Sequence, residues 1–130
     1  MSKLIITNGC FDILHPGHLY LINEAKKLGT LLILINCDLS VRELKGPTRP
    51  VNPIHVRVHN LQVHHPHVIP FHHEEYLAYL QLLRPHIIVK GGDYTYQQII
   101  HDTGGLAEVV IVPYLPGYST TQILANGRLN

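Results

Sequence analysis

Four short runs of consecutive apolar residues constrain the fold of this chain more than any other feature. They are Leu4–Ile6, Leu31–Ile35, Ile87–Val89 and Val109–Val112. A strand built from such a run is apolar on both of its faces, which is typical of a parallel sheet covered by helices on both sides. The runs therefore predict four buried strands.

Helical patterns fill the intervals between these runs. Residues Pro16–Leu28 carry apolar side chains at helical spacing, with a proline near the first turn and Gly29 just after the end. A strand, a helix and a strand in this order predict a right-handed βαβ unit. Shorter helices are expected at 40–44, 53–64, 74–83, 96–101 and 119–124, and a short strand at 68–69. The alternation predicts an α/β fold, a Rossmann-like doubly wound open parallel sheet in a single domain of residues 1–130.

Composition limits the classes of function. The chain has 130 residues, enough for one core without metal or disulfide staples. A net charge of +1 without a Lys/Arg block does not indicate nucleic-acid binding. No run approaches the roughly 20 apolar residues of a membrane span, and no export signal opens the chain. Cys10 and Cys37 form no CxxC pair, so a reduced, cytoplasmic protein is expected. Because the chain has no basic block, any anionic ligand is expected to be small.

The loop after the first predicted strand is the first place to search for a site, because ligands of such sheets bind at the carboxyl ends of the strands. Two imidazoles, His15 and His18, flank Gly17 at the start of the predicted helix. Free backbone N–H groups and the helix dipole there favour an anion, and each imidazole can donate a hydrogen bond to a phosphoryl oxygen. The alternative is structural: one histidine caps the helix and the other packs on the sheet.

The segment Thr7–Gly29, TNGCFDILHPGHLYLINEAKKLG, resembles the cytidylyltransferase-like nucleotidylyltransferase superfamily. The mark of that superfamily is HxGH after a strand ending in T/S-x-G-x-F-D. The signature is complete here, at Thr7, Gly9, Phe11, Asp12, His15, Gly17 and His18. A second mark, G-x-S-T-T/S, is similar to residues 117–121, at the start of a late predicted helix.

Three further segments narrow the resemblance. Leu44–Gly46, Arg49–Pro53 and Val89–Tyr94 resemble the adenylyltransferase domain of ADP-heptose synthase. Glycerol-3-phosphate cytidylyltransferases share the main marks but usually carry an Arg where this chain has Tyr114. A second departure is His55, which stands two residues before an Arg where the family usually has a Glu. Whether that Glu orients the Arg or supports a dimer contact is left open.

The resemblance implies a reaction and a set of roles. The implied reaction transfers a nucleoside monophosphate from an NTP to a sugar phosphate and releases pyrophosphate. By the closest resemblance the NTP is ATP and the sugar phosphate is heptose 1-phosphate. The alternatives are a CTP-dependent glycerol-3-phosphate enzyme and a non-catalytic nucleotide-binding module. Mg²⁺ would be held mainly by the NTP phosphates without protein ligands, and relatives suggest a homodimer. The implied catalytic residues are His15, His18 and Lys45. The implied nucleotide-binding residues are Thr7, Gly9, Cys10, Phe11, Gly17, Lys90, Gly92, Asp93, Gly117, Ser119, Thr120 and Thr121. The implied substrate-binding residues are Asp12, Asp38 and Arg49.

The remaining histidines raise a rival interpretation. His55 and His59 are spaced to share a helix face, and five more follow at positions 64, 65, 67, 72 and 73. A zinc hydrolase is the corresponding enzyme hypothesis. No HExxH motif and no nearby Cys accompany the cluster, so surface histidines with adventitious metal affinity are the favoured interpretation.

Overall fold

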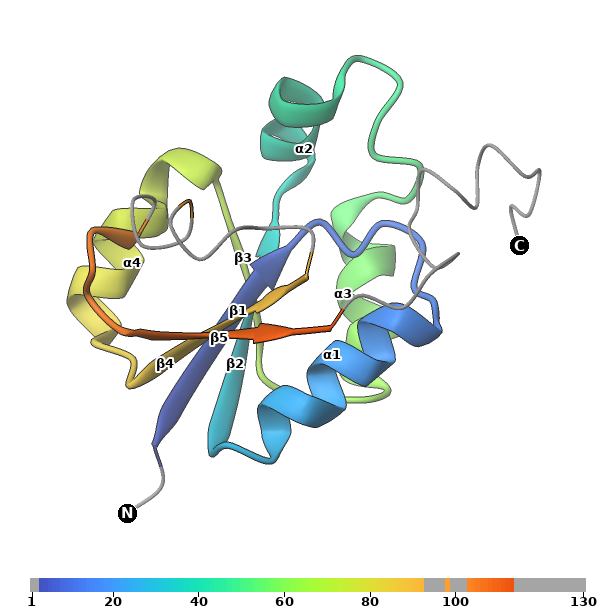
Figure 1. Cartoon of the computed structure of the whole chain (residues 1–130). Coiled ribbons are helices and arrows are strands. Elements are labelled where there is room, and N and C mark those ends of the chain that lie inside the picture. Colours follow the sequence, from blue (N-terminus) through green and yellow to red (C-terminus); the bar gives the residue numbers. More distant parts are fainter. Residues whose placement is uncertain (1–2, 93–97, 99–102, 114–130) are drawn as a thin grey trace.

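The chain folds into a parallel sheet with helices on both faces (Figure 1). The computed structural model describes residues 3–92, 98 and 103–113. Its elements are β1 (Leu4–Gly9), α1 (Pro16–Lys26), β2 (Thr30–Asn36), α2 (Asp38–Lys45), α3 (Ile54–Gln62), β3 (Val68–Phe71), a 3₁₀ turn (His73–Glu75), α4 (Tyr76–Leu83), β4 (Ile87–Gly91) and β5 (Glu108–Val112). Each of the four apolar runs forms a strand, as predicted. The helices expected at 96–101 and 119–124 fall mostly or wholly outside the described residues.

The strand order is β3-β2-β1-β4-β5, and every neighbouring pair is parallel. The chain winds outward from β1 to β3, crosses back to β4 beside β1, and continues outward to β5. This confirms the predicted doubly wound sheet. The order reverses between β1 and β4, which is where ligands of such sheets bind, beyond the carboxyl ends of the strands.

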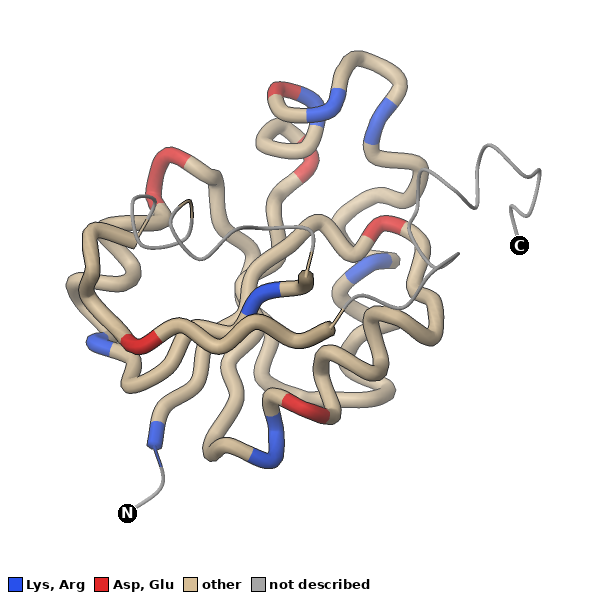
Figure 2. Tube along the Cα trace, in the orientation of Figure 1, with Lys and Arg blue, Asp and Glu red and all other residues tan. Residues whose placement is uncertain are grey.

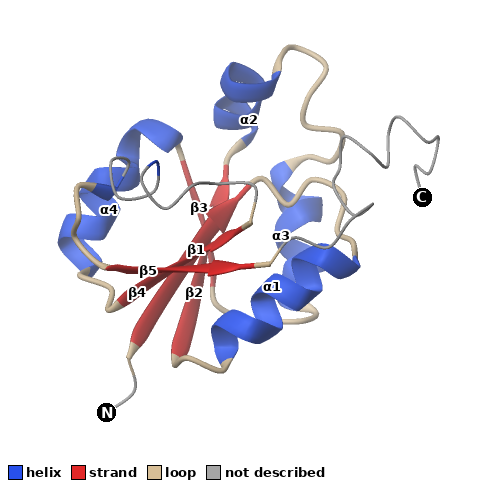
Figure 3. Cartoon of the chain, in the orientation of Figure 1, coloured by secondary structure: helices blue, strands red, loops and turns tan. Residues whose placement is uncertain are grey.

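Helices α1 and α3 cover one face of the sheet and α4 covers the other (Figure 3). Successive side chains of a strand point to opposite faces. Ile5 therefore packs in the core beneath α1 and α3, while Ile6 packs in the core beneath α4, and both are fully buried. This is why the strands read as continuous apolar runs. No helix in the described part of the chain has the length and apolarity needed to span a bilayer.

Strand β3 runs further than predicted. The sequence suggests a strand at 68–69 that stops before Pro70, but the structure continues it to Phe71. Among the described strands β3 is an edge, paired with β2. A proline has no N–H to donate, and at an edge only one side of the strand needs partners, so the proline is tolerated.

Candidate functional site

Strands β1 and β4 separate toward their carboxyl ends. Between these two fully described strands, ladder pairing is confined to residues 5–6 of β1, whereas β1 stays paired with β2 to its end. Side chains join the strands beyond that point: Thr7 Oγ1 donates to the Val89 carbonyl at 2.8 Å, and Lys90 Nζ donates to Asn8 Oδ1 at 2.9 Å. Thr7 is fully buried, so its visible contact is with the backbone of β4.

His15 caps the N-terminus of α1. Its Nδ1 accepts from the backbone N–H groups of Gly17 at 3.1 Å and His18 at 3.4 Å. The backbone donors that the sequence analysis expects to be free for an anion are therefore taken by His15 itself, which corrects that expectation. Because Nδ1 is an acceptor, the neutral ring carries its proton on Nε2. The helix start thus offers an imidazole N–H in place of backbone N–H groups.

His18 stacks on His15, with ring centroids 3.7 Å apart, and meets the edge of the Phe11 ring at 5.1 Å. Burial, with a smaller contribution from His15, lowers the pKa of His18 to about 3. Burial also lowers the pKa of His15. Both rings are therefore neutral at pH 7 in the free chain, so each carries one N–H and no positive charge.

The turn between β1 and the histidines is shaped by Gly9 and Phe11. Phe11 lies in the left-handed region at φ 45°, which non-glycine residues seldom adopt. Its ring packs over Gly9, where an added Cβ would lie 3.2 Å from the ring. The ring in turn supports His18, so these two predicted nucleotide-binding positions hold the imidazole pair in place.

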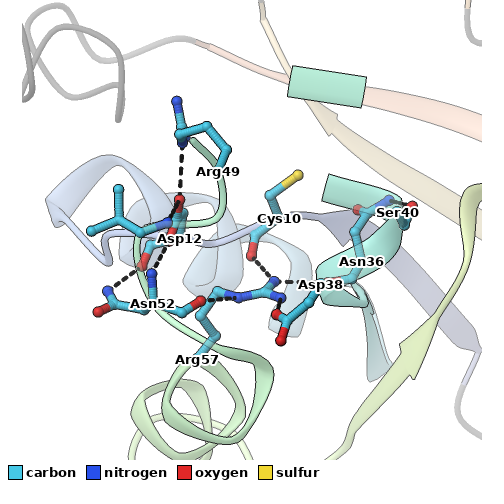
Figure 4. Close-up of polar contacts among 9 residues, drawn as sticks. Cys10, Asp12, Asn36, Asp38, Ser40, Arg49, Asn52 and Arg57 are labelled. Carbon is cyan, nitrogen blue, oxygen red and sulfur yellow. Dashed lines mark hydrogen bonds and ion pairs between the residues drawn. The ribbon is translucent and has the colours of Figure 1, made fainter. Parts of the chain in front are cut away.

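Asp12 anchors the loop that follows α2 (Figure 4). One carboxylate oxygen accepts from Arg49 Nε at 3.1 Å and from the Val51 N–H at 2.8 Å, and the other accepts from the Asn52 N–H at 2.8 Å. The Asn52 side chain also donates to the Asp12 carbonyl at 2.7 Å. Asp12, predicted to bind substrate, therefore has both oxygens occupied by this loop.

Arg57 is a fully buried cross-link that the sequence pattern does not predict. Its guanidinium donates to the carbonyls of Asn52 at 2.9 Å, Cys10 at 2.8 Å and Asn36 at 2.7 Å, and to the Asp38 carboxylate at 2.7 Å (Figure 4). The contacts join the loop after β1, the end of β2, the start of α2 and the loop before α3. Asp38, another predicted substrate contact, is thus an ion-pair partner of Arg57.

The unusual His55 is exposed on α3. Arg57 already has four acceptors from other segments, so its orientation does not depend on a Glu at position 55. The sequence signal for this cross-link is an Arg at position 57 on the same face of the predicted helix as Ile54, Val58 and Leu61.

A cavity of about 750 Å³ opens beside these contacts. Its lining residues are Asn8, Gly9, Cys10, Asn36, Leu44, Lys45, Phe71, His73, Glu74, Tyr76, Leu77, Lys90 and Thr103. Basic positions of α2 and the following loop gather at this edge of the sheet (Figure 2). The size and the mixed lining suit a small polar ligand.

The cavity brings together some predicted site residues and leaves out others. Lys45 and Lys90 both line it, but His15 and His18 do not. Lys45 is exposed and is the last residue of α2, which extends one residue beyond the helix predicted at 40–44. Burial raises the pKa of the Cys10 thiol, which therefore lines the cavity as a neutral group. The predicted residues Asp93, Gly117, Ser119, Thr120 and Thr121 lie outside the described residues.

Two histidines, one in the histidine-rich segment 55–73 and one beyond it, bond to the backbone of neighbouring strands. His65 is buried, with Nε2 at 2.6 Å from the Leu31 carbonyl. His86 Nδ1 accepts from the Leu4 N–H at 2.9 Å. The interpretation of these histidines as surface residues is therefore wrong for His65.

Glu43, His72 and His73 are the described group with metal-compatible spacing, with ligand atoms within 4.8 Å of one another. His72 Nδ1 accepts from the Glu74 N–H at 3.1 Å, so the neutral ring carries its proton on Nε2, which contacts Glu43. A metal bound at Nε2 would take the place of that proton. The neutral ring would then carry its proton on Nδ1, which could no longer accept the helix-capping bond from Glu74. The donor set therefore fits a hydrogen-bonded pair better than a metal centre.

Comparison with protein families identifies one match. The model of the family described as Cytidylyltransferase-like matches residues 6–126. Among curated proteins, the bifunctional protein HldE of Nitrosococcus oceani is 41% identical, and the alignment covers 98% of this chain. Its counterpart in Methylococcus capsulatus is 43% identical over 95% of this chain. The chain spans only 28% of the length of either relative.

Solved structures share the fold. A lipopolysaccharide core biosynthesis protein from Thermoplasma volcanium GSS1 superposes with a TM-score of 0.73 at 24% identity, covering 88% of this chain and 98% of that one. A pantoate-beta-alanine ligase from Francisella tularensis, complexed with beta-gamma ATP and beta-alanine, gives a TM-score of 0.65 at 16% identity, covering 96% of this chain and 65% of that one. At these identities the likeness concerns the fold alone.

Proposed function

Because the chain belongs to the cytidylyltransferase-like family of nucleotidyltransferases, we propose that it transfers AMP from ATP to heptose 1-phosphate and releases pyrophosphate. The nucleotide and the acceptor rest on the resemblance of Leu44–Gly46, Arg49–Pro53 and Val89–Tyr94 to the adenylyltransferase domain of ADP-heptose synthase. The reaction class rests on the family.

The observation that carries the proposal is the stacked pair of neutral imidazoles at the start of α1. His15 is held by its cap, which places the N–H of its neutral ring at Nε2, and His18 lies against it with ring centroids 3.7 Å apart. The pair follows β1, next to the point where the strand order reverses. Preorganised N–H donors at such a place stabilise charge that develops on transferring phosphates.

The chemistry needs charge stabilisation more than a base. A phosphate oxygen of the acceptor forms a bond to the α-phosphorus, and the bond from that phosphorus to the bridging oxygen breaks. Pyrophosphate leaves with the electron pair. A phosphate monoester, with a second pKa of about 6, is already anionic at neutral pH. The obstacle is repulsion between two anions, which Lys45 and Lys90 in the cavity and the imidazole donors at α1 would reduce.

Mg²⁺ fits this site as a companion of the nucleotide. When bound, it would neutralise charge on the triphosphate oxygens and keep several of its waters. Asp12 and Asp38 are engaged with Arg49 and Arg57, so the described chain offers neither as a free ligand. The ion would be held mainly by the nucleotide phosphates.

The test is a matrix of each NTP with heptose 1-phosphate or glycerol 3-phosphate in the presence of Mg²⁺, followed by pyrophosphate release. ATP with heptose 1-phosphate should be the fastest pair. A preference for CTP with glycerol 3-phosphate would replace the proposal with the cytidylyltransferase alternative. Nucleotide binding without release from any pair would indicate a non-catalytic module.

A further inference from the structure

A buried hydroxyl fixes the hydrogen-bonding state of His73. Ser40, which is fully buried in α2, accepts at Oγ from the Asn36 side-chain amide at 3.0 Å and from the His73 backbone N–H at 3.0 Å. The same Oγ lies 2.6 Å from His73 Nδ1. With both lone pairs of the hydroxyl occupied, its own proton must point to Nδ1.

The consequence is a defined tautomer. Since Nδ1 of His73 accepts from Ser40, the neutral ring carries its proton on Nε2. The ring is partly exposed while Ser40 is buried, so the edge that bears Nε2 is turned away from the core. His73 also stacks on His72, with centroids 4.2 Å apart, which restricts its rotation. The ring is a preorganised donor.

The cavity lining carries a negative charge beside His73 in sequence and positive charges on other elements. His73 and Glu74 enter the lining together after β3, whereas the cations Lys45 and Lys90 come from α2 and β4. A phosphate is attracted to the cations and repelled by the carboxylate of Glu74. A hydroxyl group suits the His73 side, because its oxygen can accept a hydrogen bond from Nε2–H while its O–H donates one to a carboxylate.

We propose that His73 and Glu74 bind a hydroxyl group of the acceptor sugar, while the lysines of the cavity face its phosphate. This inference deepens the proposed function and rests on it. His73 Nε2 donates a hydrogen bond to the oxygen of the sugar hydroxyl, and the Glu74 carboxylate accepts a hydrogen bond from that hydroxyl. Ser40 and Asn36 are positioning residues that act through the tautomer of His73. The pair thereby selects a polyhydroxylated acceptor over a bare phosphate.

Two substitutions of His73 separate these contacts. His73→Asn places an amide near the former Nδ1 and can keep the bond to Ser40, but it does not reach the position of Nε2. His73→Gln reaches that position with an N–H donor. The exposed His59 on α3, as His59→Asn, is the matched control.

Binding of heptose 1-phosphate and of inorganic phosphate is measured by calorimetry for the 130-residue chain and each of its variants, beside pyrophosphate release. His73→Asn should raise the Kd for heptose 1-phosphate by about fivefold to tenfold, the effect of one lost hydrogen bond. His73→Gln should stay within about threefold of the unsubstituted chain, and the affinity for inorganic phosphate should not change in either variant. In kinetics, the acceptor KM should rise with an unchanged KM for ATP.

The outcomes separate the two proposals. Equal heptose 1-phosphate affinity in His73→Asn and the unsubstituted chain overturns the role of His73, and so does a parallel loss of inorganic phosphate binding. Binding of heptose 1-phosphate without pyrophosphate release overturns the proposed function alone. A chain that binds no sugar phosphate overturns both.

Discussion

At the scale of single residues, the two histidines of the HxGH motif do different work. His15 Nδ1 accepts the bonds that cap α1, so the N–H of its neutral ring lies at Nε2. His18 lies against it, held between the stacked ring and Phe11. The structural interpretation, in which one histidine caps the helix, is confirmed for His15 at Nδ1, and the phosphate-binding interpretation stays a prediction for its Nε2.

The cap and the donor of His15 can be separated by substitution. Asn is a favoured N-cap residue, so His15→Asn should keep the stability of α1 but lose the Nε2 donor. We expect turnover to fall at least about 10²-fold with little change in unfolding free energy. His15→Ala should lose turnover similarly and also about 1 kcal/mol of stability. Urea denaturation and pyrophosphate release measure the two effects, and full activity in His15→Asn would exclude the donor role.

The buried His18 should make the fold sensitive to mild acid. Its pKa is about 3 in the folded chain against 6.5 as the ordinary value, so only the unfolded chain takes up this proton between these limits. Stability from the neutral ring is complete above pH 6.5 and is lost as pH falls toward 3. Between pH 7 and pH 5 the unfolding free energy should drop by about 2 kcal/mol from this group.

His18→Gln tests that pH dependence, because glutamine does not titrate. The unfolding free energy, measured by denaturation at pH 7 and at pH 5, should change less between these pH values for His18→Gln than for the unsubstituted chain. The exposed His55→Gln is the control and should keep the original difference. An unchanged difference in His18→Gln would assign the acid sensitivity to other groups.

At the scale of elements, the loop between α2 and α3 is held by the turn after β1. Asp12 alone accepts from Arg49, Val51 and Asn52, so a residue some 40 positions away determines where the loop lies. The loop follows Lys45, which lines the cavity. Its position therefore bears on the placement of a predicted catalytic cation.

Asp12→Asn should release this loop. The amide replaces one acceptor oxygen with donors, which would then face the N–H groups of Val51 or Asn52. We expect faster hydrogen exchange and faster proteolysis at residues 46–53, with a loss of about 1–3 kcal/mol of stability. Exchange in β2 should be affected much less. Equal exchange of the loop in both proteins would show that other contacts hold it.

The sequence predicts the elements better than it predicts their mutual contacts. The apolar runs and the HxGH loop depend on local spacing, and the structure places both at the expected positions. The end of β3 is missed because tolerance of Pro70 depends on the strand lying at an edge. Most bonds of Asp12, Arg57 and Ser40 are missed because they join residues 19 to 47 positions apart, and the bond from Ser40 to His73 also depends on the orientation of one hydroxyl.

At the scale of the whole molecule, two apolar cores and one polar centre hold the layers together. The cores lie on opposite faces of the sheet. The polar centre is Arg57, which connects the carboxyl ends of β1 and β2 with α2 and α3. The cavity opens at the same end of the sheet, and Cys10 and Asn36 belong both to its lining and to the partners of Arg57. A homodimer, if formed, remains a proposal that light scattering can test.

Arg57→Met provides the test of this polar centre. Methionine preserves much of the side-chain volume but leaves three carbonyls and the Asp38 carboxylate without their donor. Removing one partner from a buried charged network typically costs about 3–5 kcal/mol, a large part of the 5–15 kcal/mol that stabilises a domain. The urea midpoint should fall accordingly, with coincident transitions by fluorescence and circular dichroism.

Asp38 is 34% exposed, so Asp38→Asn should cost only about 1 kcal/mol or less. Equal losses in the two variants would mean that the ion pair with Asp38, not the three carbonyl bonds, accounts for the contribution of Arg57.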